Sequence, residues 1–197
     1  MNRKALRATV VAAVLVVTSA ALPATANEKV GVEEMLPVLG APQVPGDRIP
    51  GGIDLDAIGG VRPETVRRLG SDDVAEYWVG RLGSSSTCLI LHIAGGSEVT
   101  AAACGSITDF YNKGLALQAG ESRNNPTRSA HAYLLPADVD ATALSPMLTK
   151  VSSASDSTGP NLLSRQPQDA APLQPTDLKR DKGNIFTFRP LSNVTGR

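Results

Sequence analysis

Aromatic residues are scarce in this chain, and their scarcity limits the size of the core that it can build. They make up 4% of the 197 residues, with one Trp, three Tyr and three Phe, while 14 prolines lie mostly toward the two ends of the chain. Segments rich in proline and polar residues bury too little apolar surface to offset the entropy lost on ordering them. We therefore expect the folded part to be smaller than the whole chain.

An excess of one charge sign is also lacking, because 19 basic residues balance 19 acidic ones. Nucleic-acid binding needs a concentrated basic face, and binding to a membrane surface needs a polybasic patch, so we expect neither partner. The chain has two histidines and carries no H-E-x-x-H motif, close Cys/His cluster, EF-hand loop or phosphate loop. We expect no metal and no cofactor.

The longest apolar run lies at the N-terminus. Arg3 and Lys4 precede an uncharged stretch at residues 8–21, and Pro23 and small residues up to Ala26 follow. This is the layout of a secretory signal peptide that is cleaved after Ala26. Fourteen residues fall short of the roughly 20 that cross a bilayer, so an uncleaved anchor is the less favoured alternative. We expect a secreted protein without a membrane span after cleavage.

Proline and apolar residues divide the remaining sequence into three parts. Residues 27–60 are rich in proline and glycine and are expected to form a flexible arm. Residues 61–150 are expected to form the folded domain, and residues 151–197 a largely disordered tail. Ile185–Phe188 is the exception in the tail: it can dock as an edge strand or bind a partner, although a local apolar kink is the favoured interpretation.

Within the domain, composition predicts an α+β fold with a small antiparallel sheet of about five strands, one to three short helices and disordered arms at both ends. Strands are expected at residues 76–82, 87–93, 98–104, 115–119 and 130–135, the first three forming a meander. Short helices are expected at residues 63–69, after a capping Ser106, and at residues 138–150. A polar loop is expected from Gly120 to Arg128.

Cys88 and Cys104 are the two cysteines, and an even number in an exported chain indicates a disulfide. If the hairpin loop is residues 95–97, Ile93 pairs with Val99 and Cys88 falls directly opposite Cys104, within disulfide reach. We expect a structural bond, because redox-active cysteines usually lie two residues apart near the start of a helix. The residues facing the core in this register are Leu89, Leu91, Ile93, Val99, Ala101 and Ala103.

Histidine chemistry rests on His92 and His131. In the proposed register His92 faces Thr100 and is expected to be a packed strand residue. His131 shares a strand face with Tyr133, and a nucleophile–base–acid set can be written from Ser106, His131 and Asp109. No G-x-S-x-G elbow supports that set. We therefore assign no catalytic residue.

Several segments in succession carry a resemblance to a known type of protein. They are Tyr77-Trp78-Val79-Gly80-Arg81, Thr87 to Leu91, Ala103-Cys104, Phe110, Gly114-Leu115 and Ala132 to Pro136. The series resembles uncharacterised small exported proteins of high-GC Gram-positive, actinobacterial bacteria that share a paired-Cys hairpin. The resemblance covers about 60 residues, implies an α+β domain and transfers no catalytic residue.

These observations predict an exported, non-catalytic binding or interaction domain with an unknown extracellular or cell-envelope partner. The alternative is a small secreted hydrolase that uses His131 or His92, and a third candidate is a secreted protease inhibitor that presents Arg123 and Arg128 in the loop at residues 120–128. An enzyme would hold a histidine in a pocket within reach of an acid and a nucleophile. A binding module would show an exposed apolar patch or an open sheet edge.

Overall fold

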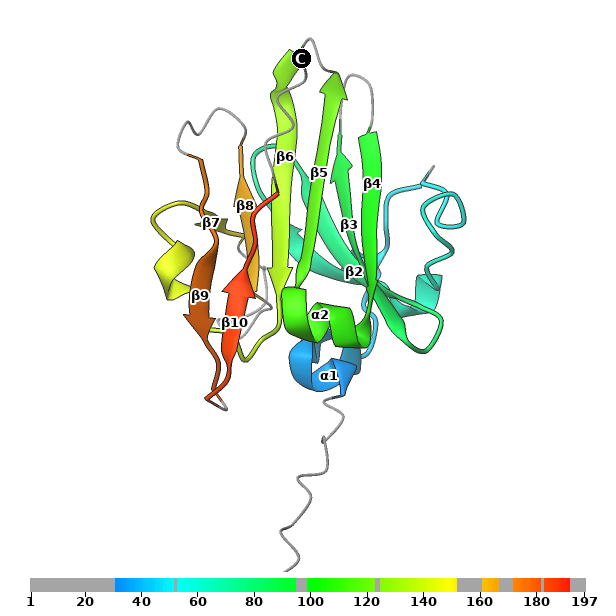
Figure 1. The fold of residues 1–197 in the computed structure, drawn as a ribbon. Helices are drawn as coiled ribbons and strands as arrows, with labels where there is room; N and C mark the ends of the chain where they lie inside the picture. The colour runs from blue at the N-terminus through cyan, green and yellow to red at the C-terminus, as the bar shows by residue number, and fades with distance from the viewer. Residues whose placement is uncertain are drawn as a thin grey trace, which may run out of the picture.

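The computed structural model describes residues 31–51, 53–94, 99–122, 125–151, 161–166, 172–181 and 183–191. Within residues 121–122 and 125–128 it describes the backbone only. The signal pattern and the hairpin loop at residues 95–97 lie outside the described ranges. In this part of the chain ten strands form three antiparallel sheets of four, four and two strands (Figure 1). The longest helix there is α2 (Ile107–Lys113). The protein is mostly β, so the α+β fold with about five strands is wrong.

The first sheet is a meander of β1 (Arg67–Ser71), β2 (Glu76–Leu82), β3 (Ser86–Ile93) and β4 (Val99–Ser106), in sequence order. The last three strands lie where the sequence predicted them. β1 begins within the expected helix and takes its last three residues, and its first three form the 3-10 turn η3 (Pro63–Thr65). Val66 packs on one side of the sheet and Leu69 on the other. Residues three positions apart on a strand point to opposite faces, and both are buried when the sheet is covered on both sides. The same spacing of buried residues is typical of a helix, which is why the sequence predicted a helix here.

The second sheet has the order β5 (Leu115–Ser122), β6 (Asn125–Leu135), β8 (Asn161–Arg165) and β7 (Thr149–Lys150). β5 and β6 run through most of the expected polar loop, and Ser122 pairs with Asn125. The helix expected at residues 138–150 is reduced to the 3-10 turn η4 (Thr142–Leu144). Pro146 accounts for the difference, because proline cannot donate a helical hydrogen bond and its ring clashes with the preceding turn.

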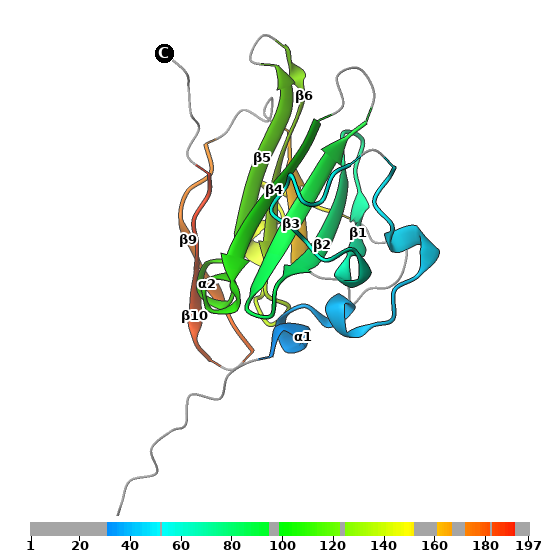
Figure 2. The same cartoon turned by 90° about the vertical axis from the view of Figure 1, so that its right-hand side faces the viewer.

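The main core lies between the two four-stranded sheets, whose strands β4 and β5 lie side by side (Figure 2). Helix α1 (Val32–Met35) and the 3-10 turn η1 (Pro37–Gly40) close one end of it. So short a helix is unstable alone, and it is held here by burying apolar side chains. The buried residues of this segment are Val32, Met35, Leu36 and Leu39. The described part of residues 27–60 therefore has a defined structure and is not the flexible arm that the sequence predicted.

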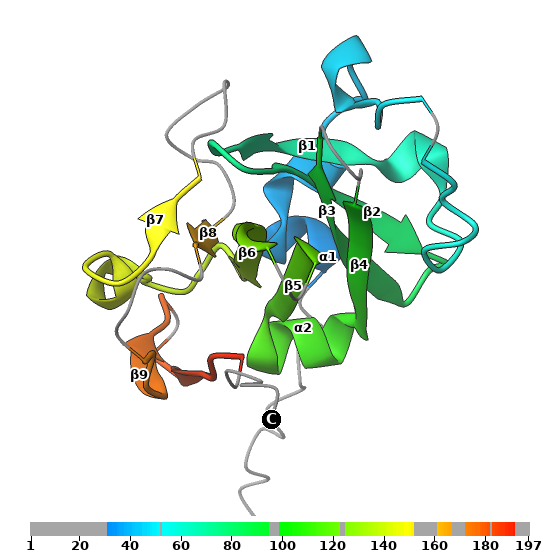
Figure 3. The same ribbon diagram turned by 90° about the horizontal axis from the view of Figure 1, so that it is seen from above.

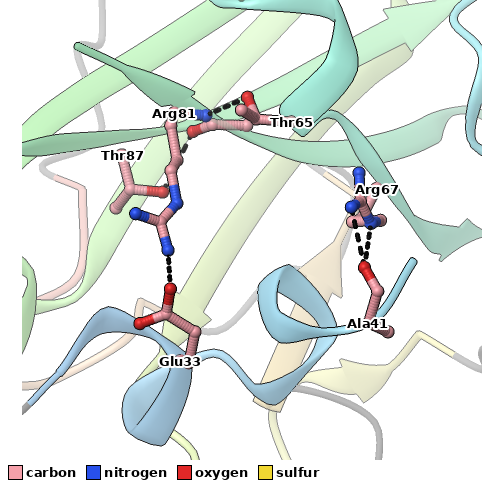
Figure 4. A network of polar contacts seen from close by, with 7 residues as sticks. Glu33, Ala41, Thr65, Arg67, Arg81 and Thr87 are labelled. Atoms are coloured by element: carbon pink, nitrogen blue, oxygen red, sulfur yellow. Dashed lines mark hydrogen bonds and ion pairs between the residues drawn. The ribbon is translucent and has the colours of Figure 1, made fainter. Parts of the chain in front are cut away.

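The N-terminal segment is also fastened to the first sheet by polar contacts (Figure 4). Arg67 donates from Nε and Nη2 to the carbonyl oxygen of Ala41, at 3.0 and 2.7 Å. Arg81 forms an ion pair with Glu33 of α1, and its backbone N–H donates to Thr65 Oγ1. The buried position of Arg67 is thus explained by backbone carbonyl oxygens that satisfy its guanidinium.

Each four-stranded sheet has its outer face covered as well. Residues 49–51 and 53–66 cover the first sheet, where Val61 and Val66 pack on Trp78. The hairpin of β9 (Thr176–Lys179) and β10 (Ile185–Phe188) covers the second sheet, on the side away from the first (Figure 3). In β10, Phe186 and Phe188 are each 1% exposed, whereas Ile185 is 70% exposed. The interpretation of this segment as a kink in a loose tail is wrong, because its two phenylalanines complete a core.

Arg180 ties the β9–β10 hairpin to the body of the protein. Its Nε and Nη2 lie 2.8 and 2.9 Å from the two carboxylate oxygens of Asp138, and Nη1 donates to the carbonyl oxygen of Tyr111 at 2.8 Å. The guanidinium carbon lies 3.7 Å from the centre of the Tyr111 ring. An ion pair and a cation–π contact therefore join the C-terminal hairpin to α2 and to the loop after β6.

The structure joins Cys88 and Cys104 by a disulfide, in the register that the sequence predicts. Ile93 pairs with Val99, and Leu89 and Leu91 face the core between the sheets. The opposite face of this hairpin is also buried, since Cys88 packs in the apolar cluster that residues 49–51 and 53–66 cover. The bond therefore lies between the first sheet and the segment that covers it.

Candidate functional site

His92 is a structural residue. Its side chain is 4% exposed, and Nδ1 lies 2.9 Å from Thr100 Oγ1 on the neighbouring strand. This is the cross-strand pair that the predicted register requires, and it satisfies one ring nitrogen inside the sheet.

Ser106 and Asp109 form a helix cap. The Asp109 backbone N–H donates to Ser106 Oγ at 3.0 Å, and the Ser106 hydroxyl donates to Asp109 Oδ2 at 2.7 Å. Lys113 then pairs with Asp109 Oδ1 at 2.8 Å, and these two hydrogen-bonding side chains lower the pKa of the Asp109 carboxyl. Among the described residues His131 Nε2 has no hydrogen-bond partner, so it bonds neither of them. The serine and the acid thus serve the start of α2.

His131 lies instead in a recess of about 250 Å³ on the outer face of the second sheet. Strand geometry places it there: His131 and Tyr133 are two positions apart on β6 and share a face, and Arg165 of β8 is the register partner of His131. Residues before β9 and after β10 supply the walls. The lining is His131, Tyr133, Arg165, Pro172, Leu173, Pro190 and Leu191.

The polar groups of the recess are held in a mostly desolvated setting. His131 is 7% exposed. Burial, and then the positive charge of Arg165, lowers the pKa of its imidazole below the ordinary value of 6.5. Tyr133 Oη accepts a hydrogen bond from the Leu191 backbone N–H at 3.3 Å, and burial raises the pKa of this phenol. The base of the recess therefore presents a neutral imidazole, a neutral phenol and a guanidinium.

Sequence reasoning recognised part of this constellation. It placed His131 and Tyr133 on one strand face, because residues two positions apart on a strand point to the same side of a sheet. It missed Arg165 and the walls, because these belong to the region expected to be disordered. The one available signal was the apolar pair Leu162-Leu163 immediately before Ser164 and Arg165.

A second polar cluster lies in the main core. Tyr77 donates from Oη to Asp72 Oδ2 at 2.7 Å, and the backbone N–H groups of Val74 and Ala75 donate to Asp72 Oδ1. Burial alone raises the pKa of Asp72, but these hydrogen bonds outweigh it and the pKa is lowered. Burial and the neighbouring carboxylate strongly raise the pKa of Tyr77. The pair holds the turn between β1 and β2 and stays in one protonation state near neutral pH.

A larger hollow of about 510 Å³ lies on the other side of the molecule, between residues 48–51, Ile53 and Leu55 on one side and the segment just before β1 on the other. Its polar lining residues Gln43, Arg48 and Glu64 are exposed, so water already solvates them. The exposed large apolar residues of the described ranges, Val44, Met147 and Ile185, lie on three separate segments. They do not form the contiguous apolar patch expected of a binding module.

None of the helices in the described ranges has the length and apolar character needed to cross a bilayer. Nor do three His, Cys, Asp or Glu side chains gather around a possible metal position anywhere in those ranges. Comparison of the chain with models of protein families, with curated proteins and with solved structures gave no match.

Proposed function

We propose that this chain is an exported, non-catalytic binding domain, and that its ligand site is the recess formed by His131, Tyr133 and Arg165. The disulfide between Cys88 and Cys104 is compatible with an oxidising location outside the cell. The signal pattern at residues 1–26 supports the same location from the sequence.

The observation that carries the proposal is an unpaired imidazole nitrogen on His131, one of the residues that line the recess. His131 Nε2 is buried and has no hydrogen-bond partner among the described residues. Leaving a buried polar group unsatisfied costs about 1–3 kcal/mol. A ligand that hydrogen-bonds to this nitrogen would recover that cost.

The shape and lining of the recess suit binding. Ligand sites are concave and largely apolar, with a few polar groups that fix orientation. Here Pro172, Leu173, Pro190 and Leu191 form apolar walls around three polar side chains. Two of the four wall residues are prolines, whose fixed φ limits the reorganisation that binding would require.

The two histidines provide a direct test, because each ring gives its own NMR signal. The protein from residue 27 onward, in its oxidised form, is mixed with a library of small neutral, cationic and anionic fragments. The His92→Asn variant assigns the two signals. We expect a subset of fragments to shift the His131 signal saturably while the His92 signal stays in place.

Three outcomes would overturn this function. The first is a library in which no fragment moves the His131 signal. The second is a set of binders that move only the His92 signal. The third is chemical conversion of ester or amide fragments, lost in His131→Asn, which would favour the hydrolase alternative.

A further inference from the structure

We propose that Cys104 is a thiol-exchange site, the sulfur at which a small external thiol opens the disulfide, with Cys88 as the leaving group. This modification site is separate from the recess and goes beyond the binding function. It follows from the positions of the two cysteines in the first sheet, from their unequal burial and from the residue that lies beside the Cys104 sulfur.

The two cysteines belong to strands with different surroundings. Cys88 lies on β3, which has a hydrogen-bonded strand on each side, whereas Cys104 lies on β4, the last strand of this sheet. Cys88 is 0% exposed and packs with Trp78 and Ile90 in the apolar cluster of the covered face. Cys104 is exposed. Molecules in solution therefore approach the bond from the Cys104 end.

The segment that covers the first sheet leaves this end of the bond open. Gly59 of that segment lies beside Cys104, and a Cβ added to the glycine would stand 3.7 Å from Cys104 Sγ. Gly59 has a φ of 114°, a backbone conformation that residues with a side chain rarely adopt. The position beside the sulfur is thus held by the residue type that shields it least.

The exposed sulfur sets the direction of the exchange reaction. A disulfide is opened when a thiolate attacks one of its two sulfurs. At Cys104 the attacking thiolate forms a new S–S bond with Sγ, while the electron pair of the old bond leaves on the Cys88 sulfur, which then takes up a proton. The products are a mixed disulfide on Cys104 and a thiol on Cys88, so one disulfide replaces another and no further oxidant is required.

Burial of Cys88 makes this exchange reversible. The departing thiolate begins in apolar surroundings, where a charged sulfur is poorly solvated. It also stays on the strand next to the mixed disulfide, since the two Cα atoms lie 4.0 Å apart. Its attack on Cys104 Sγ expels the external thiol and restores the original bond. We therefore expect the mixed disulfide of the folded protein to be short-lived.

The test uses the oxidised protein from residue 27 onward and an excess of glutathione. Acid stops the exchange after a short time, and N-ethylmaleimide in urea then blocks the free thiols. A protease that cuts after Glu98 separates the two cysteines for mass spectrometry. We expect glutathione on Cys104 and the maleimide on Cys88, with the reverse arrangement at least about tenfold rarer. In the control, urea is present from the start, both sulfurs are accessible and both arrangements should form.

Two variants compare the sulfurs one at a time. Cys88→Ala leaves Cys104 as a free thiol and Cys104→Ala leaves Cys88, and each is the control for the other because both lack the same bond. In the folded variants dithiodipyridine should react with Cys104 at least about tenfold faster than with Cys88, and in urea at equal rates. If either variant does not fold, the measurement on the wild-type protein decides the question.

The proposal fails on any of three results. One is glutathione found on Cys88 of the folded protein as often as on Cys104. Another is the absence of an adduct until urea unfolds the chain, because the bond would then be closed to thiols at both ends. The last is equal reactivity of the two folded single-cysteine variants. These results leave the binding function untouched, since that function is tested at His131.

Discussion

Arg180 offers the sharpest test of how the C-terminal hairpin belongs to the fold. Replacing it by methionine keeps much of the apolar stem and removes the guanidinium. The change breaks two contacts to Asp138, one to the carbonyl oxygen of Tyr111 and the stacking on the Tyr111 ring. The Arg180 side chain is 3% exposed, whereas that of Asp138 is 24% exposed.

The expected loss of stability follows from these exposures. Breaking a buried ion pair by removing one partner costs about 3–5 kcal/mol. The lower end applies here, about 3 kcal/mol, because water can reach the remaining Asp138 carboxylate. For a chain of this size such a loss lowers the melting temperature by roughly 6–12 °C. Asp138→Asn should cost less, and the double variant should cost less than the two single variants together, since the side chains are in direct contact.

The measurement is urea unfolding followed by the fluorescence of Trp78, the one tryptophan of the chain. Trp78 is 1% exposed and packs on the outer face of the first sheet, in a different cluster from the hairpin. A lower midpoint in this signal means that the hairpin and the first sheet unfold together. Hydrogen exchange at the amides of β9 and β10 gives the local stability in parallel.

Two results would refute the reasoning. A loss below about 1 kcal/mol in both measurements would mean that the ion pair contributes no more than an exposed one. Rapid exchange confined to β9 and β10, with an unchanged Trp78 midpoint, would mean that the hairpin opens independently of the sheets.

Three further predictions concern other parts of the molecule. Cys88→Ala/Cys104→Ala should lose about 3 kcal/mol, because the bond closes a loop across 16 positions of the unfolded chain; an unchanged urea midpoint would contradict this. The protein should become less stable as pH falls below 6.5, since His131 in the unfolded chain takes up a proton before His131 in the folded protein, where its pKa is lowered. The urea midpoint should therefore fall with pH across this range, and more steeply in the wild type than in His131→Gln. Equal slopes in the two proteins would contradict this prediction. Gly114→Ala should lose more stability than Gly183→Ala, by at least about 1 kcal/mol. Both glycines have positive φ, but a Cβ at Gly114 would lie 2.7 Å from a backbone carbonyl oxygen of β6, while a Cβ at Gly183 meets open space. Equal melting temperatures of the two variants would show that the backbone at Gly114 relaxes.

The central hairpin could be predicted from the sequence because several local constraints agree there. The glycine-rich sequence between the two strands predicts a turn, and a three-residue loop there places Cys88 opposite Cys104, which is the register of the structure. The start of α2 was predictable for a similar reason, since Ser106 and Asp109 carry a capping pattern that depends on adjacent residues alone.

The segments that cover the two sheets could not be predicted, because they adopt a fixed structure only by packing on residues far away in the sequence. Met35 and Leu36 lie among prolines and acidic residues, and only the open end of the sheet sandwich gives them a place to be buried. In β8, Leu162, Leu163 and Ser164 are all buried, so no alternating pattern marks the strand. Arg165 was missed for this reason, so the sequence predicted only the β6 residues of the candidate site, His131 and Tyr133.

The strand order of the first sheet has a consequence for folding kinetics. β1, β2, β3 and β4 pair only with their neighbours in sequence, whereas β6 must find β8 across a long intervening segment. Contacts between near neighbours require little loop closure and form quickly. We expect this meander to assemble ahead of the second sheet, so that oxidation joins two strands that are already aligned, and with two cysteines in the chain there is no wrong intramolecular pairing to correct.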